Sequence, residues 1–191
     1  MEICFATNNP GKIHEVRAML EGKYKVLSLK DIGCEDELPE TRDTIEGNSK
    51  QKAEYVWEKY GVNCFSDDTG LEVSCLNGAP GVLSARYAGP QCNPEDNMDL
   101  LLKSMLSCDD RSAQFRTSIT LIINGEVMQF EGIVEGTILK EKSGNEGFGY
   151  DPVFKPNGYE QTFAELDIKE KNQISHRGKA VRKLISYLMK K

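Results

Sequence analysis

The sequence feature that most constrains the fold is a pair of β-forming runs on either side of Asn124-Gly125. Residues 113–123 and 126–135 alternate apolar and polar positions, and both runs are rich in β-branched residues. Asn-Gly between two such runs is a strong signal for a β-hairpin, because both residues of the tight turn must adopt positive φ. A long antiparallel pair is therefore expected in the second half of the chain.

Other segments predict strands and helices in alternation. Turn-forming residues and apolar spacing place them as follows. Strands are expected at 2–7, 24–29, 62–66 and 137–140, and helices at 12–20, 44–60, 93–106 and 171–191. Bulges are expected at Gly132 and Gly136. The order predicts an α/β fold with a mixed sheet, in which a hairpin lobe follows a helix-rich lobe and a cleft lies between them. No repeat or linker divides the 191 residues, so we expect one domain over 1–191.

Charge and hydropathy narrow the class of partner. The net charge of −6 argues against nucleic-acid binding. No apolar run approaches 18 residues, which predicts that the chain does not cross a membrane. The first residues are too polar for a signal peptide, so a cytoplasmic location is expected.

The six cysteines form no CxxC pair, and the two histidines, His14 and His176, lie in unrelated contexts. This spacing makes a zinc site improbable. In a reducing cytoplasm, the cysteines are expected to be free thiols.

Two adjacent carboxylates, Asp67 and Asp68, follow the β-forming run that ends at Ser66. Thr69 and Gly70 come next, so the strand is expected to end at the aspartates. Adjacent like charges need a cation, hydrogen bonds or open water. Mg²⁺ binds one or two carboxylates together with phosphates, so the pair predicts a metal site. A solvated turn is the alternative, since Asp, Thr and Gly are ordinary turn residues.

Three further stretches carry groups that suit an anionic, planar ligand. Lys12 begins a helix after an Asn-Pro-Gly loop, where backbone N–H groups favour anions. Residues 148–151 place aromatic rings around a glycine and could form a wall against a planar ring. His176 and Arg177 stand near Lys171, and arginine offers a rigid fork of donors. Each pattern also occurs in an ordinary loop or on a solvated helix face.

Four separated blocks together resemble the inosine triphosphate pyrophosphatase family. The blocks are ATNNPGK with Glu15, FSDDTGLEV with NGAPGVLSARYAG, EGFGYDPVF with TFAEL, and KNQISHRGKA. They occur in the family's order and span residues 3–188. The resemblance implies a long twisted mixed sheet flanked by helices, with two lobes, a central cleft and a homodimeric assembly. It also implies hydrolysis of ITP, dITP and XTP to the monophosphate and pyrophosphate with Mg²⁺.

The resemblance also implies roles for individual residues. Asp68 matches the general base and metal ligand, and Glu40 the second metal ligand. The residues that match the family's contacts to the triphosphate and to neighbouring parts of the substrate are Thr7, Asn8, Asn9, Pro10, Gly11, Lys12, Lys52, Thr69 and Arg86. The residues that match the family's contacts to the purine base are Phe148, Gly149, Tyr150, Asp151, Lys171, His176 and Arg177. Three positions depart from the common pattern, since Asn8 stands where Gly is usual, Thr69 where Ser is usual and Gly47 where Glu is usual.

Two other functions remain open from the sequence. One is a pyrophosphatase for modified pyrimidine or 7-methylated nucleotides, against which the His176-Arg177 block argues. The other is a module that binds a nucleotide without turnover. Adjacent carboxylates beside lysines favour metal-assisted hydrolysis over binding alone.

Overall fold

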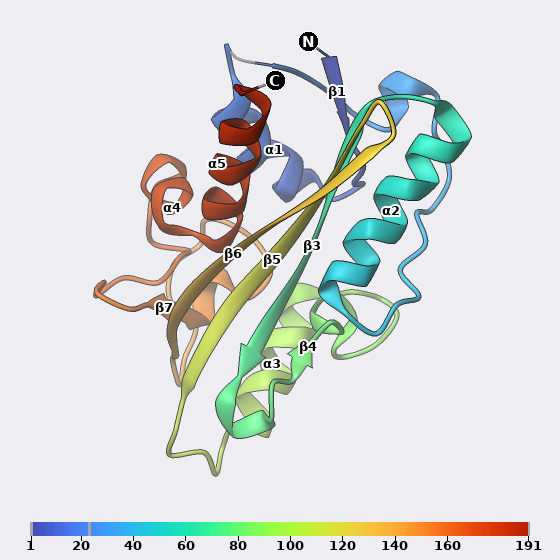
Figure 1. Ribbon diagram of the computed structural model, residues 1–191. Coiled ribbons are helices and arrows are strands. Elements are labelled where there is room, and N and C mark those ends of the chain that lie inside the picture. The colour runs from blue at the N-terminus through green and yellow to red at the C-terminus, as the bar shows by residue number, and fades with distance from the viewer. Residues whose placement is uncertain (1, 23, 191) are drawn as a thin grey trace. The chain divides into compact units, whose positions relative to one another are not determined.

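The computed structural model describes residues 2–22 and 24–190. Met1, Lys23 and Lys191, which the expected domain and terminal helix include, lie outside the described residues. Within that part of the chain, seven strands form one sheet in the order β2-β1-β3-β5-β6-β7, and β4 pairs with β3 (Figure 1). The strands are β1 (Glu2–Phe5), β2 (Lys25–Leu27), β3 (Cys64–Val73), β4 (Pro80–Gly81), β5 (Ser112–Ile123), β6 (Glu126–Ile138) and β7 (Phe154–Pro156).

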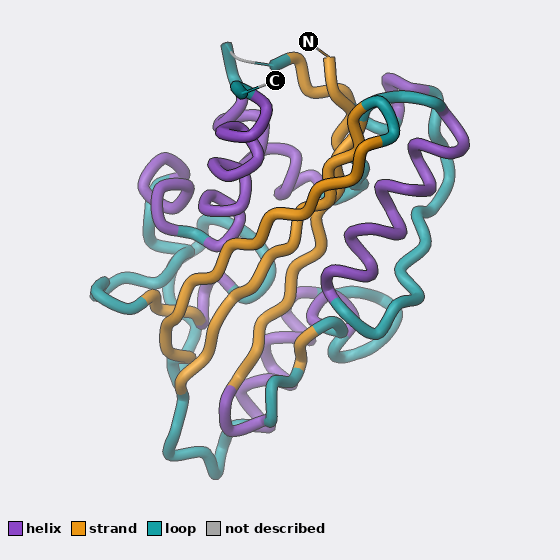
Figure 2. Tube along the Cα trace, in the orientation of Figure 1, coloured by secondary structure: helices purple, strands orange, loops and turns teal. Residues whose placement is uncertain are grey.

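The sheet is mixed, and helices flank it. Strand β1 runs parallel to β2 and β3, whereas β4 and β7 pair antiparallel with β3 and β6. The helices are α1 (Pro10–Leu20), α2 (Ile45–Tyr60), α3 (Pro94–Ser104), α4 (Ile168–Ile174) and α5 (His176–Leu188). The predicted α/β class and mixed sheet are confirmed. Figure 2 distinguishes the strands, in orange, from the helices, in purple, along the Cα trace.

The chain divides into two compact units. Unit 1 comprises residues 1–68, 117–132 and 177–191, and unit 2 comprises 69–116 and 133–176. Strands β3, β5 and β6 each contribute residues to both units. The predicted central cleft stays a prediction.

Unit 1 has a three-layer core because neighbouring residues of its strands face opposite sides of the sheet. On one face, Phe5 and Phe65 stack with ring centroids 4.6 Å apart and pack with apolar residues of α1 and α5. On the other face, Cys4 and Cys64 pack with Ala53 of α2. In Figure 1, α1 and α5 accordingly lie on the side of these strands opposite to α2.

Unit 2 has a core of its own, which is built by α3 and by the residues of β3, β5 and β6 that belong to this unit. Leu101 of α3 packs with Leu71, Phe115, Phe154 and other buried residues. The rings of Phe115 and Phe154 lie 4.7 Å apart and are tilted by 60°. His176, one of the candidate site residues, stacks on Phe115 of this aromatic cluster.

Several local predictions are confirmed, and each has a local cause. Asn124 and Gly125 adopt φ values of 51° and 84°, as the tight β5–β6 turn requires. Helix α2 begins after Thr44, whose side chain accepts a hydrogen bond from Gly47 N–H. Asn93 caps α3, and Pro94 occupies its first turn.

The prediction that a strand ends at Asp67 is wrong, since β3 continues through both aspartates to Val73. The side chains of Lys12 and Arg177 pair with Asp67, so a buried carboxylate can remain inside the strand. The separate strand expected at 137–140 is also wrong, because β6 runs without interruption to Ile138. The terminal helix is divided at Ser175, where α4 ends in an extended residue before α5 begins.

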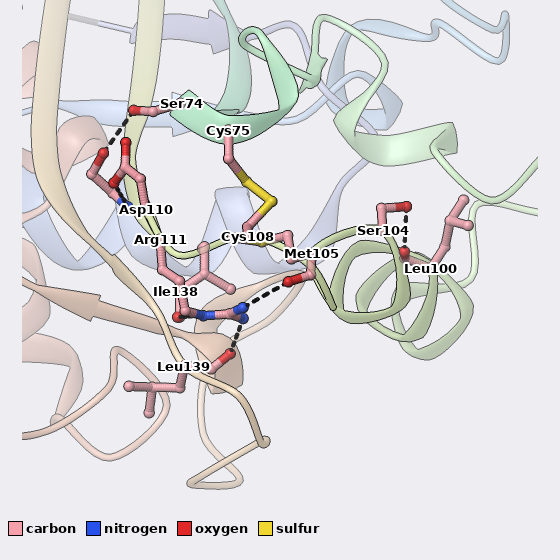
Figure 3. The surroundings of a disulfide bond; sticks show 11 residues. Ser74, Cys75, Leu100, Ser104, Met105, Cys108, Asp110, Arg111, Ile138 and Leu139 are labelled. Carbon is pink, nitrogen blue, oxygen red and sulfur yellow. Dashed lines mark hydrogen bonds between the residues drawn. A yellow bond between two sulfur atoms is a disulfide. The ribbon is translucent and has the colours of Figure 1, made fainter.

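The prediction that the cysteines are free thiols is wrong for one pair. Cys75 and Cys108 form a disulfide in unit 2, with their Cα atoms 6.1 Å apart (Figure 3). Arg111 lies close by and donates hydrogen bonds to the carbonyl oxygens of Met105 and Leu139. Folding brings Cys75 and Cys108 together across 33 residues, and no short sequence motif predicts this pairing. Cys4, Cys34, Cys64 and Cys92 are free.

Reduction of this disulfide is expected to lower the stability of the protein. A cross-link that spans 33 residues stabilises the fold by about 3–4 kcal/mol in the chain-entropy relation. The free energy of unfolding in urea would be measured with and without reductant for the wild type and for Cys75→Ser/Cys108→Ser. Reductant should affect the wild type and not the double variant, and Cys92→Ser should behave as the wild type. Equal stability of oxidised wild type and double variant would contradict the expectation.

Candidate active site

The loop before α1 presents polar groups and a lysine at the helix N-terminus. Asn9 caps the helix by accepting a hydrogen bond from Lys12 N–H at 3.1 Å. Asn9 N–H in turn donates to Thr7 Oγ1 at 3.2 Å, which fixes the loop. Pro10 fits the first position of the helix, where a missing N–H costs nothing. Asn8 is exposed, as are Asn9 and Pro10, while Gly11 and Lys12 are half-buried.

Asp67 lies between two cations. Its Oδ1 is 3.0 Å from Lys12 Nζ, and its Oδ2 accepts a hydrogen bond from Arg177 Nε at 2.9 Å. Arg177 Nη1 also donates to Glu15 Oε2 at 2.5 Å. Asp67 and Arg177 are almost completely buried, and Glu15 is buried on α1. The four side chains alternate in charge and come from α1, β3 and α5.

Lys52 lies between two other carboxylates. Its ammonium group donates to Glu40 Oε1 and stands 3.5 Å from Asp68 Oδ1. Lys52 is buried on α2, and Asp68 is buried in β3. The structure therefore brings together Glu40, Lys52 and Asp68, which are separated in sequence.

The segment that carries Glu40 is fastened to α2 by side chains that the sequence did not single out for this role. Thr41 N–H donates to Gln51 Oε1, and Arg42 N–H donates to Asn48 Oδ1. Gly47 allows this close approach, because a Cβ there would lie 2.8 Å from the Cβ of Arg42. The glycine that departs from the family pattern thus has a packing reason.

Burial acts in the same direction on the pKa values of the two aspartates, but the neighbouring charges outweigh it only at Asp67. Burial raises the pKa of Asp68, and Lys52 and Lys12 oppose that rise. Burial also acts to raise the pKa of Asp67, but Lys12 and Arg177 outweigh it and hold that pKa well below its ordinary value. The adjacent aspartates are therefore electrostatically distinct.

The lysines also differ. Burial acts to lower the pKa of Lys52, but Asp68 and Glu40 keep it above its ordinary value. Burial lowers the pKa of Lys12, and Asp67 offsets only part of that effect. Lys52 is thus a firmly charged group between two carboxylates.

The carboxylates fit a magnesium ion. Asp68 Oδ2 is buried and has no hydrogen-bond partner among the described residues. In that part of the chain, no group of three or more His, Cys, Asp or Glu side chains is placed to hold a metal by itself. Mg²⁺ commonly takes one or two carboxylates and completes its shell with water and substrate phosphates. Glu40 and Asp68 provide such a partial oxygen set.

Unit 2 holds a second group of predicted site residues. Asp151 Oδ2 accepts hydrogen bonds from Lys171 Nζ at 2.6 Å and from Phe148 N–H at 2.8 Å. The Lys171 ammonium group also lies 4.9 Å from the centre of the half-buried Phe148 ring. Gly147 has a φ of 77°, and a Cβ there would collide with Asp151 Oδ2 at 2.1 Å. The absence of a side chain at Gly147 therefore allows the loop to wrap around Asp151.

Tyr150 and His176 occupy buried positions in unit 2. Tyr150 donates a hydrogen bond to the carbonyl oxygen of Ser84 at 2.8 Å and belongs to the hydrophobic core. The His176 ring stacks on Phe115 with centroids 4.6 Å apart. Sequence reasoning missed this support by Phe115, because its alternating strand pattern resembles that of any core residue.

The remaining predicted residues have the following positions. Thr69 follows Asp68 in β3 and is half-buried in unit 2. Arg86 is half-buried at the end of a short 3₁₀ turn in unit 2, and Gly149 adopts a φ of 64° in the loop beside Phe148. Arg177 lies in unit 1 with Asp67, although the resemblance grouped it with His176 and Lys171.

Together, the mixed sheet and the carboxylate–lysine cluster define an α/β protein equipped to bind a metal ion and a phosphorylated ligand. The Ham1 family model matches residues 3–187, and the chain belongs to this family. The resemblance found from the sequence blocks is thereby confirmed.

Individual relatives support the same assignment over the whole length. The chain is 56% identical to the dITP/XTP pyrophosphatase of Flavobacterium psychrophilum over 187 residues, covering 98% of both chains. It matches the solved structure of a HAM1 protein from Coxiella burnetii with a TM-score of 0.90 and 35% identity, covering 100% of both chains. It matches the Staphylococcus aureus Ham1 protein with a TM-score of 0.89 and 37% identity, covering 99% of this chain and 98% of that chain.

Proposed function

We propose that this protein is a nucleoside triphosphate pyrophosphatase that converts ITP, dITP and XTP to the monophosphate and pyrophosphate. Such an activity removes deaminated purines from the nucleotide pool. The observation that carries the proposal is the Glu40–Lys52–Asp68 cluster, in which a buried aspartate oxygen stands beside a charged lysine. The pyrophosphatase relative that matches at 56% identity supports the same reaction and substrate class.

The proposed cofactor is Mg²⁺, which Glu40 and Asp68 would hold. When bound, it would supply positive charge that offsets the charge of the leaving pyrophosphate. Asp68 orients the attacking water and accepts its proton as the α-phosphorus is attacked. Lys52, Lys12 and Arg86 stabilise the charge that spreads over the phosphate oxygens in the transition state. The loop from Thr7 to Gly11 would place the triphosphate at the N-terminus of α1, where the helix dipole favours an anion.

The two units take separate parts of the task in this proposal. Unit 1 carries Glu40 and Asp68 for the metal and Lys12 and Lys52 for the phosphates, whereas Arg86 belongs to unit 2. Unit 2 carries the residues for the base, in which Phe148 offers a ring for stacking and His176 and Lys171 offer donors. The single domain with two lobes, the homodimer and the cytoplasmic location belong to the same proposal. The described residues contain no helix that is long and apolar enough to cross a membrane.

Pyrophosphate release tests the function directly. Purified protein would be incubated with dITP, XTP, dATP and a modified pyrimidine triphosphate, and the phosphate products would be followed over time with and without Mg²⁺. We expect pyrophosphate and monophosphate from dITP and XTP only when Mg²⁺ is present. Release of single phosphates, or turnover of the pyrimidine alone, would reject the proposal.

Replacement of His176 is expected to weaken the discrimination between purines. ITP and XTP carry an acceptor oxygen at position 6, whereas ATP carries a donor amine, so a buried donor pairs only with the former. We expect His176→Ala to reduce the ratio of kcat/KM for dITP over dATP by about tenfold. The exposed His14 provides the matched control, because His14→Ala should leave the ratio unchanged. An unchanged ratio in His176→Ala would remove His176 from the set that reads the base.

A further inference from the structure

We infer that Asp67 is a positioning residue, whose carboxylate holds the Lys12 ammonium group toward the phosphates with Arg177 and Glu15 as its buried support. The inference rests on the proposed function, since that function gives Lys12 its phosphate contact. It assigns a separate role to each member of the Asp67-Asp68 pair.

The contacts of Asp67 lead to this role. Each of its carboxylate oxygens faces a different cation, Lys12 at 3.0 Å and Arg177 at 2.9 Å. Glu15 accepts a hydrogen bond from Arg177 on the far side of the guanidinium group, so that group is itself held between two carboxylates. A buried side chain in such a network has little freedom to turn, and the Lys12 ammonium group is held with it.

The direction of the strand separates Asp67 from the metal ligands. Both aspartates belong to β3, and consecutive side chains of a strand point to opposite faces. Asp67 contacts residues of α1 and α5, whereas Asp68 contacts Lys52 of α2. If Asp67 served as a metal ligand, it would have to leave its buried partners. Asp68 has a buried oxygen without a hydrogen-bond partner among the described residues and needs no such change.

The network also has a balanced charge. Glu15 and Asp67 carry two negative charges, and Lys12 and Arg177 carry two positive ones. If Asp67 acted on the phosphates only by repelling them, its removal would leave a more positive site that attracts phosphates more strongly. If Asp67 holds Lys12 in place, its removal weakens phosphate binding although the site becomes more positive. The two roles therefore predict effects of opposite sign.

A double-mutant cycle between Asp67 and Lys12 tests the inference. Calorimetry would measure the binding of inorganic tripolyphosphate, without divalent metal, to the wild type, Asp67→Asn, Lys12→Ala and the double variant. We expect Asp67→Asn to weaken binding by about tenfold, and by less than about twofold when Lys12 is already alanine. Asp36→Asn is the control, because Asp36 forms an exposed ion pair with Lys59 at 2.7 Å and should not affect binding.

Three results would overturn the inference. They are tighter binding in Asp67→Asn, equal losses in both backgrounds, and a tenfold increase in the Mg²⁺ concentration that half-activates Asp67→Asn during pyrophosphate release. The third result would make Asp67 a metal ligand. If Asp67→Asn does not fold, Glu15→Gln replaces it in the cycle with the same expected pattern. Absence of pyrophosphate release by the wild type would instead reject the proposed function, while the binding cycle still decides the role of Asp67.

Discussion

Asp68→Asn is expected to lose about 10²–10⁴-fold in kcat, which is the usual contribution of a general base. Asparagine has nearly the shape of aspartate but can neither accept the proton of the attacking water nor offer a charged oxygen to the metal. Steady-state release of pyrophosphate from dITP at saturating Mg²⁺ measures the change.

The same substitution should leave folding intact. Burial raises the pKa of Asp68, so the folded metal-free protein disfavours the charged form of this side chain. A neutral amide at the same place is therefore not expected to destabilise the fold. Urea unfolding of the metal-free variant would verify this, with Asp109→Asn as an exposed aspartate control for both assays. Turnover near that of the wild type would refute the role of Asp68.

Local sequence predicted the parts of the fold that have local causes. Asn124-Gly125 defined the hairpin because few residues other than glycine and asparagine tolerate positive φ. Thr44 marked the start of α2 because its hydroxyl satisfies an N–H group of the first helical turn. Neither inference required knowledge of a distant residue.

Predictions failed where distant partners decide the local structure. The residues after Ser66 resembled a turn, and only Lys12 and Arg177, which are remote in sequence, explain why the strand continues through Asp67. The disulfide between Cys75 and Cys108 depends equally on tertiary proximity. The spacing of residues in the sequence predicts neither the ion pairs of Asp67 nor the disulfide.

The candidate site shows the same division. The family resemblance implied roles for Glu40, Lys52 and Asp68, and the structure places Lys52 in contact with both carboxylates. Glu15 was noted only as part of a matching block, although a signal was available. It stands one residue before Val16, on the side of α1 whose apolar spacing marks it as buried. A charged residue on such a face calls for a buried partner, which here is Arg177.

Arg177→Met is expected to lower the free energy of unfolding by about 3–5 kcal/mol, because it leaves buried carboxylates without their shared cation. The guanidinium group of Arg177 pairs with both Asp67 and Glu15, and its side chain is only 1% exposed. For a chain of 191 residues, this loss corresponds to a melting temperature lower by roughly 6–20 °C. Methionine retains much of the apolar volume, so the change reports mainly on the lost charge.

Arg182→Met is the matched control, since Arg182 is exposed on the same helix α5 and its replacement should change stability by less than about 0.5 kcal/mol. Urea unfolding of both variants, followed by helical circular dichroism, measures the difference. The resemblance to the family implied that Arg177 contacts the base, a role that a solvated, weakly paired side chain could fill without affecting stability. Equal unfolding midpoints for Arg177→Met and the wild type would therefore favour that role. A large shift would instead show that the buried ion pairs of Arg177 stabilise the fold.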